Sequence, residues 1–206
     1  MKLYFTRHGE SEANIQHVIS NWESPFGLTE KGQQQAAALA QTLSEVPLAA
    51  MYVSPVKRAR ETADILSQAL GLPYQVTEAL REYDCGVLED RSDSEAWQQH
   101  TDIAEDWSLR QNYTRKPEGG ESYFDIQNRF LPFVRSIAND PAHQDKNVLF
   151  VGHGGLLQLM LPELFDNVDH EFVRSNGIGH THSIVAETTP SGIRCLQWGA
   201  VQFGLE

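Results

Sequence analysis

Residues 147–155 read NVLFVGHGG, an apolar, β-prone run that stops abruptly at glycines on either side of a histidine. An uninterrupted apolar run of this kind is typical of a strand buried on both faces, as in the parallel sheets of α/β proteins. The apolar residues from Leu156 to Leu164 then predict a helix. The pattern therefore predicts a strand with His153 and Gly154 at its carboxyl end.

The amino terminus has the same arrangement. Residues 3–5, LYF, predict a short strand that stops at a polar turn, which puts Arg7 and His8 at its carboxyl end. Another strand is expected over 49–53. The dipeptide Ser54-Pro55 closes it, and we interpret this pair as an N-cap followed by proline at the first helical position.

Amphipathic helices alternate with these strands. One follows a capping Thr29, and another runs past Arg58 to a stop at Gly71. Two further strand-like runs occupy 183–187 and 193–198. This alternation predicts an α/β fold, a three-layer sandwich with a mostly parallel central sheet and helices on both faces. Such sheets bind ligands at the carboxyl ends of their strands.

The composition fits a single domain over residues 1–206. Hydrophobic residues make up 40% of the chain and charged residues 21%, so the chain can bury a full core. The segment from about 84 to 122 mixes acidic residues with tryptophan. We interpret it as a cap-like insertion over one end of the sheet, with a helix over 94–107.

The charge balance limits the classes of partner that the protein can bind, and the cysteine count indicates its cellular compartment. The chain has 28 acidic and 16 basic residues, a net charge of −12 that repels both phosphodiester backbones and anionic lipid. Neither nucleic acid nor a membrane is therefore expected as a partner. The first seven residues are too polar for a signal or membrane segment, and Cys85 and Cys195 have no metal-site spacing. We expect a reduced, cytoplasmic protein.

Four side chains at the predicted strand ends indicate an anion site. Arg7 and Arg58 supply guanidinium forks that pair with phosphate oxygens, and His8 and His153 supply imidazoles, which can attack phosphorus. Metal binding is the competing use of the histidines. However, their spacing matches no HExxH-type site, and the arginines would repel a divalent cation. We expect no metal and no cofactor.

Six blocks of the chain carry a resemblance to a known family. They are 7–14 (RHGESEAN), 28–32 (LTEKG), 54–63 (SPVKRARETA), 80–89 (LREYDCGVLE), 117–122 (PEGGES) and 151–155 (VGHGG). In this order they resemble the motifs of the histidine phosphatase superfamily, in the branch that contains cofactor-dependent phosphoglycerate mutases and their phosphatase relatives. The resemblance covers nearly the whole chain and implies a phosphoglycerate mutase-like fold.

The resemblance also implies a role for each matching residue. His8 would be the phosphorylated nucleophile, Arg7 and Arg58 the phosphate clamps, Glu82 the proton donor and His153 a second phosphate ligand. Four more residues would bind substrate: Ser11, Asn14, Ser20 and Gly154. Capping of the segment after the first strand is the alternative for the first two of these. Because His8 attacks through one ring nitrogen, we expect the other to donate to a backbone carbonyl in the turn.

The sequence departs from the family pattern in three places. Residues 87–90, VLED, replace a frequent W-E-G ending, which changes the expected local substrate contacts but spares Glu82. Asn21 stands where many mutases have glycine, and it is the replacement that best tolerates a left-handed backbone. The paired arginines of classical mutases have only a loose counterpart here, Arg115 and Lys116. Most of the other histidines are expected at the surface: His17, His100, His143, His170, His180 and His182.

We interpret the chain as a phosphatase that hydrolyses small phosphomonoesters through a phosphohistidine. The short acidic cap lacks the extra cations with which a mutase holds a bisphosphate and excludes water. A cofactor-dependent phosphoglycerate mutase is the alternative, whereas the complete catalytic set argues against an inactive phospho-ligand binding module. Trp97 and Trp107 are candidates for leaving-group recognition. The expected partner is a small phosphorylated metabolite, and a homodimer is left open.

Overall fold

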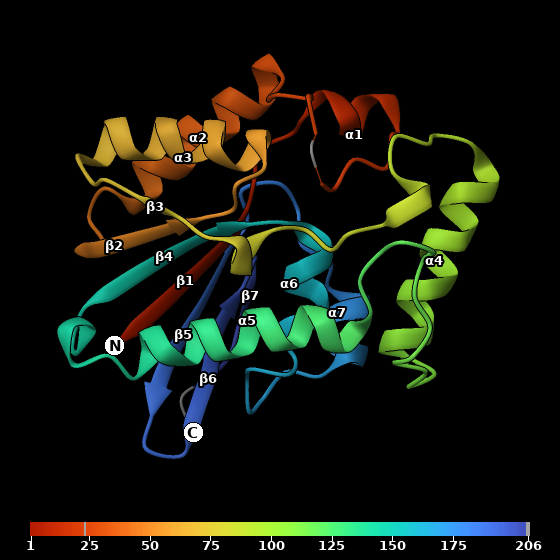
Figure 1. The fold of residues 1–206 in the computed structure, drawn as a ribbon. Helices are drawn as coiled ribbons and strands as arrows, with labels where there is room; N and C mark the ends of the chain where they lie inside the picture. The colour runs from red at the N-terminus through yellow and green to blue at the C-terminus, as the bar shows by residue number, and fades with distance from the viewer. Residues whose placement is uncertain (23, 205–206) are drawn as a thin grey trace.

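The computed structural model describes residues 1–22 and 24–204, and these contain a seven-stranded sheet (Figure 1). The strands lie in the order β3-β2-β4-β1-β5-β6-β7. Their bounds are β1 Lys2–Arg7, β2 Leu48–Val53, β3 Gln75–Val76, β4 Asn147–Gly152, β5 Ser183–Thr189, β6 Gly192–Trp198 and β7 Val201–Gln202.

Helices cover both faces of the sheet (Figure 1). One face carries α2 (Glu30–Leu43) and α3 (Lys57–Leu70), and the other carries α5 (Tyr123–Ala138), α6 (Gly154–Met160) and α7 (His170–Ser175). The remaining helices are α1 Glu12–Gln16, α4 Ser94–Ser108 and the 3₁₀ turns η1 Glu78–Leu80, η2 Gly86–Leu88 and η3 Pro141–His143. The predicted α/β sandwich is confirmed.

Strand β4 joins the two layers of the core. Its residues Val148 and Phe150 pack with Phe5 in the cluster that reaches α5 and α6. Leu149 and Val151 pack in the second cluster, together with apolar side chains of α2 and α3. Because both faces of the strand are buried, its sequence is apolar without alternation. The predicted burial of this strand on both faces is confirmed.

The sheet is mixed rather than parallel throughout. Strands β3, β2, β4 and β1 run parallel, whereas β5, β6 and β7 continue the sheet as antiparallel neighbours. The short connection between Thr189 and Gly192 makes β5 and β6 a hairpin. A connection of this length can join only antiparallel strands.

The pairing of β1 with β4 brings the two predicted histidines together. Arg7 is in register with Gly152, and the backbone N–H of His8 donates to the carbonyl of Gly152 at 3.0 Å. The residues that follow each strand, His8 and His153, are therefore neighbours at the carboxyl edge. This is the edge at which open α/β sheets bind ligands.

Two predicted helix boundaries are wrong. Helix α3 begins at Lys57 with Val56 as its N-cap, because the first helical carbonyl is that of Val56 and not that of Ser54. Helix α6 ends at Met160 and does not reach Leu164. Pro162 explains this end, since a proline has no N–H to continue the helical hydrogen bonds.

The segment 84–122 contains η2 and α4, and α4 lies beside the carboxyl ends of the parallel strands (Figure 1). The expected helix over 94–107 is present as Ser94–Ser108. The division into one domain with a cap-like insertion stays a prediction. Within residues 1–22 and 24–204, no helix is both long and apolar enough to cross a membrane.

Candidate active site

A cavity of about 450 Å³ opens at the carboxyl edge of the sheet. The five side chains expected to be catalytic come together at this edge. Arg7, His8, Arg58 and Glu82 line the cavity, and His153 lies behind them with its ring centroid 5.2 Å from that of His8. His8 and His153 are almost completely buried.

The imidazole of His8 has one fixed tautomer. Its Nδ1 lies 2.7 Å from the carbonyl oxygen of Gly9, which can only accept, so Nδ1 carries the hydrogen. Its Nε2 accepts a hydrogen bond of 2.9 Å from Nε of Arg58. Burial, followed by the charge of Arg58, holds the pKa of His8 well below its usual range. The ring is therefore neutral at pH 7, and its lone pair is on Nε2, where it accepts from Arg58.

Arg58 is held in place by three contacts. Besides His8, it donates from Nη1 to the carbonyl of Ser20 at 2.6 Å, and its Nη2 lies 3.2 Å from Nδ1 of His153. Burial lowers the pKa of Arg58 to about 10, so the guanidinium stays charged at neutral pH. A cation fixed in this way can stabilise an anion without rearranging.

Arg7 is the second cation of the cavity. Its Nη1 donates to the carbonyl of Ile178 at 3.0 Å, which anchors the side chain. Its Nε is buried and has no hydrogen-bond partner among the described residues, and the same holds for Oγ of Ser20. Both residues line the cavity. Since buried donors are normally paired, these two atoms indicate where a polar ligand binds.

Ser54 fixes the ring of His153, a role that the sequence analysis missed. Its Oγ lies 2.7 Å from Nε2 of His153 and also accepts from the N–H of Val56 at 3.2 Å. Because Arg58 can only donate, Nδ1 of His153 accepts and Nε2 donates to Ser54 in this arrangement. Burial, reinforced by Arg58, also holds the pKa of His153 well below its usual range.

Glu82 is buried at the amino end of α6. Its carboxylate accepts from the N–H groups of Leu156 at 2.7 Å, Gly155 at 2.9 Å and Tyr83 at 3.1 Å. Burial raises the pKa of Glu82, against the opposing effects of Arg58 and these three donors. Gly155 is required here, because a Cβ would lie 2.7 Å from the Tyr83 ring and 3.0 Å from the carboxylate.

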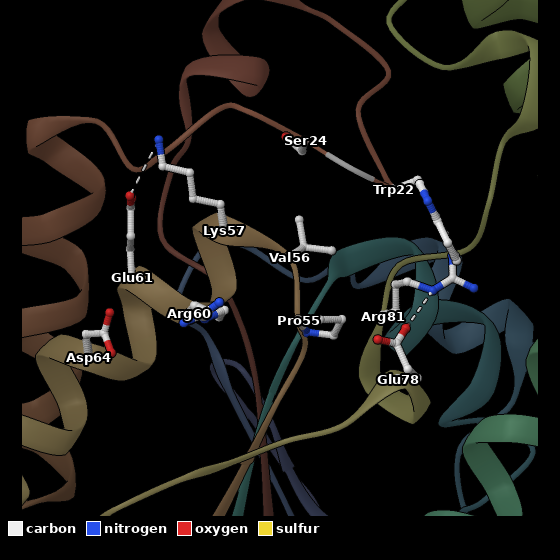
Figure 2. A pocket seen from close by; sticks show the side chains of 10 residues that line it. All are labelled: Trp22, Ser24, Pro55, Val56, Lys57, Arg60, Glu61, Asp64, Glu78 and Arg81. Carbon is white, nitrogen blue, oxygen red and sulfur yellow. Dashed lines mark ion pairs between the residues drawn. The ribbon is translucent and has the colours of Figure 1, made fainter.

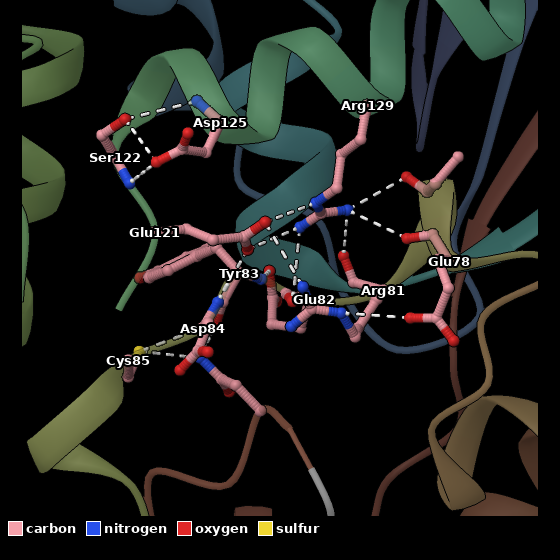
Figure 3. Close-up of polar contacts among 12 residues, drawn as sticks. Glu78, Arg81, Glu82, Tyr83, Asp84, Cys85, Glu121, Ser122, Asp125 and Arg129 are labelled. Carbon is pink, nitrogen blue, oxygen red and sulfur yellow. Dashed lines mark hydrogen bonds and ion pairs between the residues drawn. The ribbon is translucent and has the colours of Figure 1, made fainter. Parts of the chain in front are cut away.

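Arg129 of α5 holds the backbone that carries Glu82 (Figure 3). Its Nη1 donates to the carbonyl of Arg81 at 2.8 Å and its Nη2 to that of Glu82 at 3.4 Å. The guanidinium of Arg129 is paired with the carboxylate of Glu121, which accepts from Nε of Arg129 at 2.8 Å. This network fixes the loop between η1 and η2, and no sequence pattern indicated it.

The predicted substrate-binding residues have different positions. Asn14, Ser20 and Gly154 line the cavity. Ser11 is buried outside it and caps α1, with its N–H and hydroxyl both bonded to Oδ1 of Asn14. His180 donates from Nε2 to the same oxygen at 3.0 Å. Oδ1 of Asn14 therefore receives three hydrogen bonds, which fix this side chain at the wall of the cavity.

The expectation that most other histidines lie at the surface is wrong, because only two of the six are exposed, His17 and His182. The other four are half-buried: His100, His143, His170 and His180. His100 and His170 line the cavity, and the ring of His180 is half-buried with its centroid 5.8 Å from that of His8. His100 lies 2.6 Å from the hydroxyl of Tyr83, and burial lowers its pKa to about 4. Single histidines in helices and loops give no periodic signal that could have located them.

Three other expectations about this region need correction. The backbone of Asn21 is not left-handed; its amide instead donates to the carbonyl of Tyr83. Arg115 pairs with Asp106 at 2.6 Å and does not line the cavity. Of the two tryptophans, Trp97 lines the cavity, whereas Trp107 is completely buried in the core.

A second cavity, of about 460 Å³, lies outside the catalytic group (Figure 2). Arg81 stacks 3.5 Å above the ring of Trp22 at one end of it. Its cations have acidic neighbours, with Lys57 paired to Glu61 and Arg81 beside Glu78. None of the described residues that line this cavity is a histidine, so it does not resemble the site at the sheet edge.

Comparison with known families identifies the family to which these active-site residues belong. The profile of the histidine phosphatase superfamily (branch 1) matches residues 3–201. The chain belongs to this superfamily. The resemblance drawn from the six sequence blocks is confirmed, and the expectation of a phosphatase is confirmed at the level of the family.

Curated relatives of this histidine phosphatase are longer proteins. The 6-phosphofructo-2-kinase/fructose-2,6-bisphosphatase 1 of Bos taurus is 32% identical over 197 residues, 94% of this chain. The human protein of the same name is also 32% identical over 94% of this chain. The chain spans 38% of the length of each of these relatives.

Solved structures match over nearly the full length of both chains. Bacillus stearothermophilus YhfR is 32% identical, with a TM-score of 0.81 and coverage of 98% of each chain. A mycobacterial glucosyl-3-phosphoglycerate phosphatase in complex with VO3 is 27% identical, with a TM-score of 0.81 and coverage of 97% of this chain and 99% of that one.

Proposed function

We propose that this chain hydrolyses small phosphomonoesters through a phosphohistidine formed on His8. The observation that carries the proposal is the state of that imidazole. Its Nδ1 donates to the carbonyl of Gly9, so its lone pair is on Nε2, which accepts a hydrogen bond from Nε of Arg58 at the wall of the cavity. A neutral imidazole held in this way is an activated nucleophile, because its acceptor nitrogen needs no deprotonation.

In the first step, Nε2 of His8 attacks phosphorus and the bond to the ester oxygen breaks. Negative charge grows on the equatorial oxygens, where Arg7 and Arg58 can hold it. Burial raises the pKa of Glu82, and the negative charge of a bound phosphate favours its protonated form further, so that Glu82 can give a proton to the leaving oxygen. The products of this step are the free alcohol and phospho-His8.

In the second step, Glu82 acts as a base. Its carboxylate takes a proton from water, the water oxygen attacks phosphorus, and the bond to Nε2 breaks to release inorganic phosphate. His153 can support both steps by a change of tautomer. If Ser54 donates its hydroxyl hydrogen to Nε2 of His153, and Nη2 of Arg58 turns from Nδ1 to a phosphoryl oxygen, then Nδ1 can carry a hydrogen and donate it to the phosphoryl group.

The cap supports hydrolysis over phosphoglycerate mutase activity. A mutase must hold a bisphosphate against the phosphoenzyme and keep water away from it. Here Arg115 is neutralised by Asp106, and the cavity face of α4 has no arginine or lysine. We propose that the segment 84–122 acts as a cap that selects the leaving group.

A phosphate-release panel tests the proposal. It compares phosphorylated three-carbon acids, sugar phosphates and p-nitrophenyl phosphate, alongside isomerisation of 3-phosphoglycerate with and without 2,3-bisphosphoglycerate. We expect phosphate release that persists in EDTA, and no isomerisation faster than hydrolysis. Isomerisation that depends on the bisphosphate would instead establish the mutase. The cytoplasmic location, the small-metabolite partner and a homodimer remain predictions.

A further inference from the structure

The cavity continues beyond His8 between two walls, of which one is uncharged at its α4 face and the other contains an arginine. The first wall is the face of α4 made by Trp97, His100, Ala104 and Ser108. The second wall is made by α6 and α7, and its members include Gln158, His170, Val173 and Arg174. A leaving group attached to a phosphoryl group at His8 lies between these walls.

The charged residues of the cavity are unbalanced. Among the residues that the structure describes, the lining contains three arginines, Arg7, Arg58 and Arg174, but a single carboxylate, that of Glu82. The chain as a whole has the opposite excess, with 28 acidic and 16 basic residues. A local positive excess in an acidic protein selects anions at that place rather than attracting them generally.

Arg174 is placed differently from the other two arginines. Arg58 is buried, with 4% of its surface exposed, and Arg7 is half-buried, so both lie deep enough to hold the reacting phosphoryl group. Arg174 lies in the last turn of α7 and is solvent-exposed. It therefore belongs to the outer part of the cavity, on the side of the leaving group.

The guanidinium of Arg174 has no hydrogen bond or ion pair to any other residue within 1–22 and 24–204. Glu171, three residues earlier in α7, forms no ion pair with Arg174 within the described residues, and another acidic side chain beside the helix, Glu163, is engaged elsewhere. It accepts from the hydroxyl of Tyr123 at 2.9 Å and lies 3.2 Å from Nε2 of His170. The five donors of Arg174 are therefore available to a ligand, in the planar geometry that suits a carboxylate or phosphate.

We propose that Arg174 binds an anionic group on the leaving-group side of the substrate, so that the preferred substrates are phosphomonoesters with a second carboxylate or phosphate. This inference rests on the proposed phosphatase function and narrows its substrate class. Arg174 acts here in substrate selection, and the chemistry at His8 does not depend on it.

Two substrate pairs isolate the second charge. 3-Phosphoglycerate and glycerol 3-phosphate share a three-carbon skeleton and differ by a carboxylate in place of a hydroxymethyl group. Fructose 1,6-bisphosphate and fructose 6-phosphate differ by a phosphate. We expect kcat/KM to favour the charged member of at least one pair by about tenfold, the size of one charge-assisted contact at a partly hydrated site. The responding pair identifies the preferred anion.

Substitutions at Arg174 test whether this residue causes the preference for the charged member of each pair. Arg174→Gln should bring the ratio within each pair close to one, and Arg174→Lys should restore part of it. Lys146→Gln removes one positive charge at the opposite end of β4 and should leave the ratio unchanged. Hydrolysis of p-nitrophenyl phosphate should stay within about twofold in Lys146→Gln. In the two Arg174 variants its kcat/KM should fall less than that of the charged substrates, because its leaving group has no second anion.

The failure of this inference differs from the failure of the proposed function. If the wild-type protein hydrolyses these esters but the ratios are the same in Arg174→Gln, the anionic subsite is overturned and the phosphatase stands. If the wild-type protein releases no phosphate from any ester, p-nitrophenyl phosphate included, the proposed function itself fails.

Discussion

Nε of Arg58 donates a 2.9 Å hydrogen bond to Nε2 of His8, the nitrogen that we propose attacks phosphorus. The contact keeps the nucleophilic nitrogen unprotonated and aims its lone pair at the guanidinium. It also places a fixed cation where the phosphoryl oxygens must lie during attack. The same guanidinium reaches Ser20 and His153, so one side chain orders the whole group.

Arg58→Lys should lower kcat/KM for p-nitrophenyl phosphate by about 10²–10³-fold, because a lysine ammonium is a point charge and cannot make the three forked contacts of Arg58. Arg60→Lys, at an exposed position two residues later on the same helix, is the matched control and should keep full activity. Steady-state kinetics with thermal melts of both variants would check this. Equal activity of the two variants would remove Arg58 from the catalytic group.

Glu82→Gln should slow phosphoryl transfer by about 10²–10⁴-fold from alkyl phosphates, whose alkoxide leaving groups need a proton. Transfer from p-nitrophenyl phosphate should be slowed much less, because its leaving group needs little protonation. Single-turnover phosphorylation rates for the two substrate types measure the difference. Equal losses would mean that Glu82 supports the site and that the proton comes from elsewhere.

Trp97 and Trp107 should have separable effects, although they lie in one helix. Trp97 lines the cavity, so Trp97→Ala should raise KM for bulky substrates several-fold and change their ranking. Trp107 is completely buried, so Trp107→Ala should reduce the free energy of unfolding by about 3–5 kcal/mol. Denaturant unfolding and a substrate panel for both variants test this. A Trp107 variant of normal stability with an altered substrate ranking would reverse the assignment.

His100 should make stability depend on pH. Burial lowers its pKa to about 4, below the unfolded value of about 6.5, so between these values the unfolded state binds a proton that the folded state does not. Its contribution to stability is therefore present above pH 6.5 and is lost as the pH falls toward 4. The loss is at most about 1.4 kcal/mol per pH unit for one such group.

Urea unfolding at pH 7.5 and pH 5.0 measures this dependence. His100→Gln keeps a hydrogen-bond partner for Tyr83 but cannot titrate, so it should lose less stability than the wild-type protein between these pH values. The buried His8 and His153 act in the same direction in both proteins, and the comparison cancels them. An identical pH dependence in the two proteins would show that His100 titrates normally.

The sequence predicted the part of the site that depends on strand ends. The residues after two buried runs, His8 and His153, had to meet once both runs became parallel neighbours in one sheet. Glu82 was different, because it follows a 3₁₀ turn and no periodic pattern places it. Only the resemblance to the family assigned it a role.

The residues that sequence reasoning missed depend on short, irregular elements. Ser54 fixes His153 only because α3 begins three residues after it, and His180 reaches Asn14 from the loop before β5. Arg174 faces the cavity from a helix of six residues. Such contacts are set by tertiary packing, which propensity and hydrophobic patterning do not contain.

Trapping of a phosphoenzyme on His8 tests the central claim most directly. Rapid quenching of a ³²P-labelled ester should leave one acid-labile, base-stable label, and peptide mapping should locate it on His8. His8→Ala should carry no label and lose turnover, whereas His153→Ala should still be labelled on His8, more slowly. Label at another residue, or full turnover by His8→Ala, would contradict the account.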